Sequence, residues 1–150
     1  MEAAGAARIR ARESEVRELI RRLGVRLGSL GWVVIVLALV EAGWLTFDGT
    51  RALVVGDYVT PKSGPHAGQL GPWSKVVAAA GIEPRSTLMK SFHLGLGAAW
   101  LVVIACYAMR MPWARPGMLV CAVLGLWYLP VGTVLSVLQI VLLCLPALRR

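Results

Sequence analysis

A polar segment between two apolar runs, residues 48–90, contains several side chains that could act in acid–base or nucleophilic catalysis. A carboxylate or a histidine there could serve as a general base, and a serine could serve as a nucleophile. No recognised catalytic spacing joins these residues, and the chain has neither a nucleotide-binding glycine motif nor a Gly-x-Ser-x-Gly sequence. We therefore expect no enzymatic activity and no catalytic residue. The residues considered are Asp48, Asp57, Tyr58, Ser63, His66 and Glu83.

Residues that could bind a metal or a cofactor are equally sparse. The two histidines, His66 and His93, are too few for a multi-histidine metal site or a haem held by two histidines within a helix bundle. The three cysteines, Cys106, Cys121 and Cys144, lie within apolar runs and lack Cys-x-x-Cys spacing. The pattern predicts no metal, no cofactor and no disulfide framework.

Glu41 lies inside the apolar run of residues 30–47, where an acidic side chain is unusual. In a helix it would lie roughly 9 Å below the end near Phe47. An acidic group at the middle of a membrane helix costs about 2.5–3.5 kcal/mol, so it should face the protein interior and find a partner. Ser136 and Gln139 lie at suitable depths in a later helix, and His93 lies nearer the surface. Two interpretations stay open: a protonated Glu41 that joins helices through Gln139, or a carboxylate that binds a proton or a cation.

The composition and the apolar runs predict the elements that position these residues. Of the 150 residues, 57% are hydrophobic and 16% are charged, and the mean hydropathy is +0.68, far from an ordinary soluble domain. Residues 30–47 and 91–109 are each long enough to span a bilayer. Residues 113–148 predict two short helices joined by a turn near Pro130 and Gly132. We expect an all-α integral membrane protein whose domain, residues 30–150, has four transmembrane helices.

Residues 1–29 predict a basic amphipathic helix, because apolar residues recur at helical spacing opposite arginines and glutamates. We favour a helix that lies on anionic lipid at the cytoplasmic surface over one that docks a cytoplasmic partner. Binding to nucleic acid is not expected, because no aromatic residue interleaves with the arginines to stack on a base. The arginines expected to lie on lipid are Arg8, Arg12, Arg17, Arg21, Arg22 and Arg26.

The distribution of basic residues predicts the orientation. With the N-terminus inside and four membrane helices, the cytoplasmic segments are the more basic ones, as the positive-inside rule requires. The prediction is a multi-pass protein of the bacterial cytoplasmic (inner) membrane, with both termini in the cytoplasm and residues 48–90 outside. The outer basic residues are Arg51, Lys62, Lys75, Arg85 and Lys90, and the inner ones beyond the N-terminal segment are Arg110, Arg115, Arg149 and Arg150.

Proline, glycine and other small residues predict local features. Pro72 and Gly81 bracket a short helix in the outer segment, and Pro84 or Ser86 is expected to begin the second long helix. Small residues in that helix predict a close contact with a neighbouring helix. They are Gly95, Gly97, Ala98 and Ala99.

We expect neither of two processing signals to operate in this chain. A cleavable signal peptide is disfavoured by the long charged segment before the first apolar run. The "LPVGT" sequence at residues 129–133 differs from the Leu-Pro-any-Thr-Gly pattern of sortase substrates, because Gly132 precedes Thr133 and the cleaved Thr–Gly bond is missing.

The terminal hairpin, "LWYLPVGTVLSVLQIVLL", resembles the ending of a set of small bacterial four-span membrane proteins in which a Pro-x-Gly-Thr turn joins the last two helices. The resemblance covers about a quarter of the chain and implies a membrane hairpin, but no activity.

The expected function is that of a non-catalytic small membrane protein. Its predicted contacts are membrane lipids together with either a membrane-protein partner or further copies of itself, and we expect an accessory or structural subunit of a larger membrane complex. The alternative is a small transporter or channel in which Glu41 handles a proton or another cation. A transporter predicts a polar cavity around Glu41, whereas a subunit predicts a buried Glu41 and an apolar flank.

Overall fold

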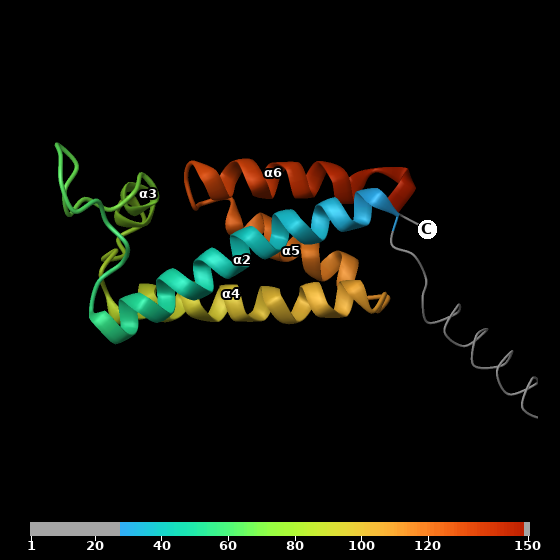
Figure 1. Cartoon of the computed structure of the whole chain (residues 1–150), viewed down its shortest axis with the longest axis horizontal. Helices are drawn as coiled ribbons and strands as arrows, with labels where there is room; N and C mark the ends of the chain where they lie inside the picture. Colours follow the sequence, from blue (N-terminus) through green and yellow to red (C-terminus); the bar gives the residue numbers. More distant parts are fainter. Residues whose placement is uncertain (1–27, 149–150) are drawn as a thin grey trace, which may run out of the picture.

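The structure is a computed structural model that describes residues 28–148, and every regular element in this part of the chain is helical. The helices are α2 (Ser29–Val55), α3 (Trp73–Ala79), α4 (Thr87–Ala108), α5 (Ala114–Gly125) and α6 (Val131–Cys144), followed by the 3-10 helix η1 (Pro146–Leu148). Four helices, α2, α4, α5 and α6, lie along the long axis of one bundle, and α3 lies at one end with the segment that precedes it (Figure 1). The amphipathic helix predicted for residues 1–29, with its six arginines, lies outside the described residues.

Helix α2 is longer than the predicted apolar run. It continues through Asp48, Gly49 and Thr50, where Thr50 Oγ1 donates a hydrogen bond to the Thr46 carbonyl at 2.7 Å. It ends before Gly56, whose φ of 94° is the left-handed conformation typical of a glycine after a helix. The polar connection between the long helices is therefore residues 56–86 and not residues 48–90.

The predicted short helix and the predicted start of the second long helix are both confirmed. Helix α3 lies between Pro72 and Gly81, and Gly81 has a φ of 79° that favours glycine. Ser86 caps α4, because its side chain accepts a hydrogen bond from the Met89 amide at 3.2 Å.

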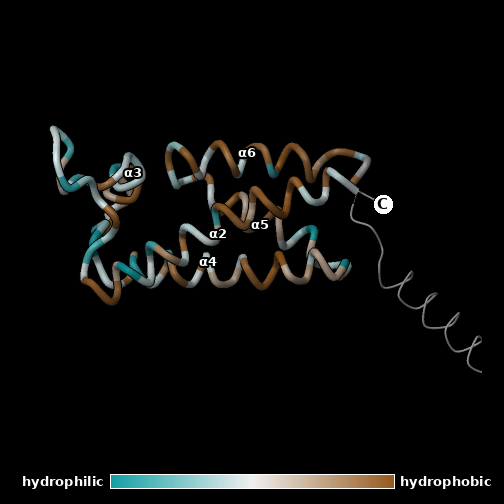
Figure 2. The backbone as a smooth tube through the Cα atoms, in the orientation of Figure 1, coloured by the Kyte–Doolittle hydropathy of each residue, from teal (hydrophilic) through white to brown (hydrophobic). Residues whose placement is uncertain are grey.

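Two of the four predicted membrane helices have the necessary length. α2 has 27 residues and α4 has 22, and both are apolar enough to cross a membrane. α5 and α6 have 12 and 14 residues, fewer than the about 20 that a full crossing needs. α5 ends at Gly125, and Gly132 lies in the first turn of α6 instead of the connecting turn. Hydrophobic residues predominate along α5 and α6, whereas residues 56–86 include most of the hydrophilic stretches (Figure 2).

Glycines allow α2 and α4 to pack closely. A Cβ atom on Gly49 would lie 2.5 Å from the Leu94 amide nitrogen, and one on Gly97 would lie 2.6 Å from the Thr46 amide nitrogen. Gly97 is thus the only one of the four predicted small residues that makes this contact. Gly95, Ala98 and Ala99 are exposed, because they lie on the opposite side of α4 from the buried positions.

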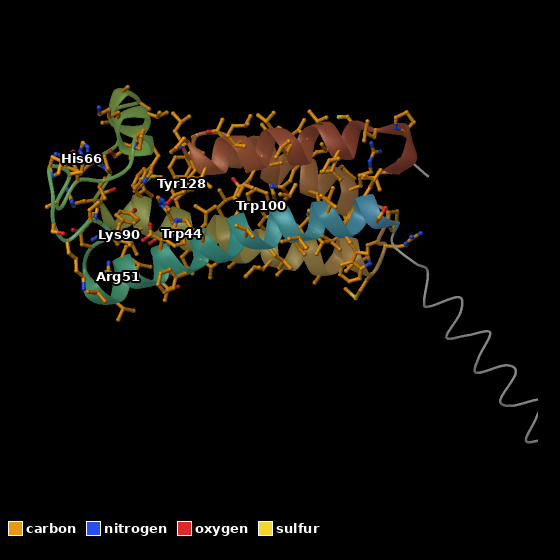
Figure 3. The ribbon with its side chains drawn as sticks, turned by 45° about the horizontal axis from the view of Figure 1, so that its top comes forward. Trp44, Arg51, His66, Lys90, Trp100 and Tyr128 are labelled. Atoms are coloured by element: carbon orange, nitrogen blue, oxygen red, sulfur yellow. The ribbon has the colours of Figure 1, made fainter. Side chains whose placement is uncertain are left out.

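The middle of the bundle is apolar. Trp100 is completely buried, and it packs in one core with residues from all four long-axis helices (Figure 3). Cys106 and Cys121 belong to this core, Cys144 is exposed, and all three are free thiols.

Candidate functional site

Glu41 joins α2 to α6. Its side chain is 2% exposed, Ser136 Oγ donates a hydrogen bond to its Oε1 at 2.9 Å, and Gln139 Nε2 donates one to its Oε2 at 2.9 Å. Both partners are the residues expected from their depth in the helices. Each carboxyl oxygen therefore has a donor within the bundle, and the two bonds link positions that are far apart in the chain.

Two glycines make room for the Glu41 carboxyl group. A Cβ atom on Gly125 would lie 2.6 Å from Glu41 Oε1 and 2.5 Å from Ser136 Oγ, and one on Gly132 would lie 3.0 Å from Glu41 Oε1. A Cβ atom at either position would collide with the Glu41 carboxyl group or its neighbours, so the present arrangement requires glycine there. The sequence pattern placed Gly132 near a turn and did not single out Gly125, so the part of these glycines in the cluster was not predicted.

His93 does not join Glu41. Its buried ring lies at the end of the bundle next to residues 56–86, with Nδ1 2.9 Å from the Met89 carbonyl oxygen and 3.3 Å from Tyr58 Oη. His93 therefore adds no charge beside Glu41, because its ring turns toward Tyr58.

Four aromatic rings from three parts of the chain surround His93. The His93 ring centroid lies 4.9 Å from those of Tyr58 and Trp73, 5.1 Å from that of Trp127 and 5.8 Å from that of Tyr128. Sequence patterns did not predict this cluster, because it forms only when residues 56–86 fold over the α5–α6 turn. Residues 70–73, "LGPW", contained the one available signal, a tryptophan at a predicted helix start.

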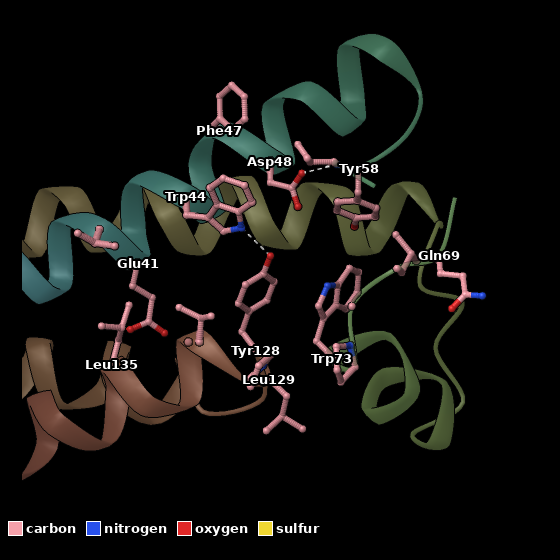
Figure 4. Close-up of a pocket in the computed structure, with 18 of the residues that line it drawn as sticks. Glu41, Trp44, Phe47, Asp48, Tyr58, Gln69, Trp73, Tyr128, Leu129 and Leu135 are labelled. Atoms are coloured by element: carbon pink, nitrogen blue, oxygen red, sulfur yellow. Dashed lines mark hydrogen bonds between the residues drawn. The ribbon is translucent and has the colours of Figure 1, made fainter. Parts of the chain in front are cut away.

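A cavity of about 950 Å³ lies between α2, residues 56–72, α3 and the α5–α6 turn (Figure 4). The Trp44 Nε1 donates a hydrogen bond to Tyr128 Oη at 2.7 Å and so connects two of its walls. Most of the lining is apolar or aromatic, and Glu41 and Asp48 contribute carboxyl groups. The size falls within the range of about 300–1,000 Å³ that is usual for small-molecule sites.

The remaining acid–base candidates are dispersed. Arg85 Nε donates to Asp57 Oδ1 at 3.0 Å, and this hydrogen bond holds the pKa of Asp57 below its ordinary value. His66 is exposed and its Nδ1 lies 3.2 Å from Gln69 Oε1. Ser63 and Glu83 are exposed. Within residues 28–148, no group of three histidine, cysteine or acidic side chains could hold a metal ion.

No protein-family model, curated protein or solved structure matches this chain. Function must therefore be argued from the geometry of the bundle and its cavity.

Proposed function

We propose that the chain is a non-catalytic integral membrane protein that serves as an accessory or structural subunit of a larger membrane assembly. The observation that carries this proposal is the apolar surface of the bundle. Large hydrophobic side chains face outward along all four long-axis helices. An apolar surface of this extent is unfavourable in water and is typical of a surface that contacts lipid or another protein. Examples are Trp32 at 57% exposure, Val36 at 55%, Val102 at 61%, Val120 at 58% and Val134 at 58%.

The placement of polar side chains supports the same proposal. Glu41, Ser136 and Gln139 are buried and bonded to one another, which is how polar groups are accommodated within a hydrocarbon environment.

The bundle supports a topology in which both ends lie on one side of the bilayer. The start of α2 and the C-terminal end of α6 lie at the same end of the bundle, and residues 56–86 lie at the other (Figure 1). We propose that α2 and α4 cross the bacterial inner membrane, and that α5 and α6 complete a four-helix membrane domain as a shorter hairpin. Both termini would be cytoplasmic.

Membrane extraction and thiol labelling test this proposal. The full chain should stay in the membrane after an alkaline wash and be released by detergent. In a cysteine-free variant, an impermeant thiol reagent applied to intact cells should label a cysteine at position 74, and not one at position 14 or at the C-terminus. Release by the alkaline wash, or labelling at position 14, would contradict the proposal. Co-purification in mild detergent should then recover a membrane-protein partner in a fixed ratio.

A second candidate function is proton or cation handling by Glu41, and one observation favours it: Glu41 is among the residues that line the cavity. The two hydrogen bonds to Glu41 favour the structural role. Glu41→Gln distinguishes the two functions, because the amide keeps hydrogen-bonding capacity but cannot ionise. If Glu41→Gln preserves folding and complex formation while Glu41→Leu loses them, the structural role stands. A Gln variant that assembles normally but abolishes a measured proton or cation flux would instead establish ion handling.

A further inference from the structure

The outer part of the cavity contains a buried carboxylate with spare bonding capacity. Asp48 is 2% exposed, and its Oδ1 accepts a hydrogen bond from the Val59 amide at 2.8 Å. Within residues 28–148 we find neither a hydrogen bond to its Oδ2 nor an ion pair to Asp48. Figure 4 places this carboxylate between Trp44 and Tyr58, at the wall of the cavity. A buried carboxylate with one free oxygen favours a cationic occupant, because the cation would offset the cost of burying the charge.

The same part of the cavity is rich in aromatic rings. The ring centroids of Trp44 and Phe47 lie 5.9 Å apart, those of Tyr58 and Trp73 lie 5.1 Å apart, and those of Trp73 and Tyr128 lie 5.9 Å apart. Aromatic faces are electron-rich and attract organic cations, quaternary ammonium groups in particular. All five rings line the cavity, and they come from α2, residues 56–72, α3 and the α5–α6 turn.

The cavity continues from these rings to the apolar surface of the bundle. Val40 and Val131 line it and are 55% and 62% exposed, and Leu135 lies beside them on α6. This side accommodates an apolar body and opens toward the surface that we propose to face lipid.

No cationic side chain among the described residues forms an ion pair with Asp48. Lys75 lines the cavity but is exposed, so water and salt screen its charge. Arg51 donates from Nη1 to the Asp57 carbonyl at 2.7 Å, and its charge acts on Asp48 without a hydrogen bond between the two side chains.

We propose that this cavity binds an amphiphilic organic cation. Its ammonium or phosphonium head would lie among the five rings beside Asp48, and its apolar body would lie along Val40, Val131 and Leu135. Such a cation is supplied either by a free amphiphile or by a lipid headgroup such as choline. The site goes beyond the accessory role and depends on the proposed membrane location only for the environment of the apolar body.

Binding of a hydrophobic cation to the purified full chain tests the site. The probe is tetraphenylphosphonium, and the control ligand is tetraphenylborate, which has a similar shape and the opposite charge. Calorimetry in maltoside detergent should detect saturable binding of the cation and none of the anion over the same concentrations. Equal binding of both ions would overturn the proposal, because the site would then recognise only apolar bulk.

Variants locate the site within the cavity. Asp48→Asn keeps an acceptor for the Val59 amide but removes the charge, so the affinity for tetraphenylphosphonium should fall about tenfold or more. Glu83→Gln removes an exposed carboxylate that does not line the cavity and should leave the affinity for tetraphenylphosphonium unchanged. Phe47→Leu alters an exposed ring and should weaken binding about two- to fivefold.

Circular dichroism and gel filtration check that each variant folds. If Asp48→Asn does not fold, Phe47→Leu decides the test, and wild-type affinity in every folded cavity variant would refute the site.

The two sources of the cation are separated in vesicles. If a choline headgroup occupies the cavity, tetraphenylphosphonium should bind more weakly in phosphatidylcholine vesicles than in vesicles of an uncharged galactolipid. Equal affinities assign the cavity to a free amphiphile. Alkaline extraction of the membrane protein does not depend on Asp48, so failure of the binding experiment and failure of the proposed function are distinguishable.

Discussion

Two buried carboxyl groups, those of Glu41 and Asp48, lie in different surroundings. At Glu41, each carboxyl oxygen accepts a hydrogen bond, and Gly125 and Gly132 make room for the group between the helices. At Asp48, one carboxyl oxygen accepts a hydrogen bond from the Val59 amide, and the carboxylate lies beside the aromatic rings that line the cavity. The Glu41 cluster is built for a fixed contact between helices. The cavity wall at Asp48 retains bonding capacity and space, which are features of a binding site.

The largest expected effect comes from filling the space beside Glu41. Gly125→Ala would place a methyl group against Glu41 and Ser136, and overpacking of this kind costs about 1–3 kcal/mol. Gly95→Ala is the matched control, because a Cβ atom there meets nothing within 4 Å and an alanine favours the helix by roughly 0.5–1 kcal/mol. Unfolding by sodium dodecyl sulfate should rank the variants in this order. Equal stabilities would mean that the region around Glu41 is not tightly packed.

A smaller effect is expected from deleting a single hydrogen bond at Glu41 or in the wall of the cavity. Gln139→Leu leaves Glu41 Oε2 without a donor at a buried position and should cost about 1–2 kcal/mol. Tyr128→Phe removes the exposed bond to Trp44 and should cost less than about 1 kcal/mol. The same unfolding assay measures both. A larger loss of stability from Tyr128→Phe than from Gln139→Leu would mean that the wall of the cavity, and not the Glu41 cluster, contains the stronger contact.

The smallest effect is expected at the Asp57–Arg85 ion pair, which lies in residues 56–86. The Arg85 hydrogen bond lowers the pKa of folded Asp57, so the pair stabilises the fold fully above the ordinary aspartate pKa and loses this contribution as pH falls through the lowered value. Both side chains are 45% exposed, which limits the contribution to about 0.2–1 kcal/mol. The stability difference between the wild type and Asp57→Asn should therefore shrink on acidification below about pH 4. A constant difference from pH 6 to pH 2 would rule out this linkage.

The sequence predicts those features that depend on hydropathy and local spacing. The two long helices, α3 and the Ser86 cap follow from apolar runs and from the conformational preferences of proline, glycine and serine. The partners of Glu41 follow from depth alone, because helices of known pitch place Ser136 and Gln139 near its level.

Features that depend on tertiary packing could not be predicted in this way. Asp48 and Gly49 look like the end of a helix in the sequence, but burial against α4 lets α2 continue beyond them. Gly97 and Gly95 have the same local pattern, and only the position of α2 distinguishes them. The cavity needs residues 56–86 to fold across the α5–α6 turn, an arrangement that leaves no periodic signal.

The hydrogen bonds of Glu41 also have a consequence for biosynthesis. Its partners, Ser136 and Gln139, follow it by 95 and 98 residues, so they leave the ribosome about 5–20 s later at a synthesis rate of roughly 5–20 residues per second. During this interval the nascent α2 of the proposed membrane protein contains a carboxyl group without its native donors. The insertion machinery, a protonated side chain or a transient lipid contact must accommodate it until α6 arrives, so α6 completes the membrane integration of a helix made well before it.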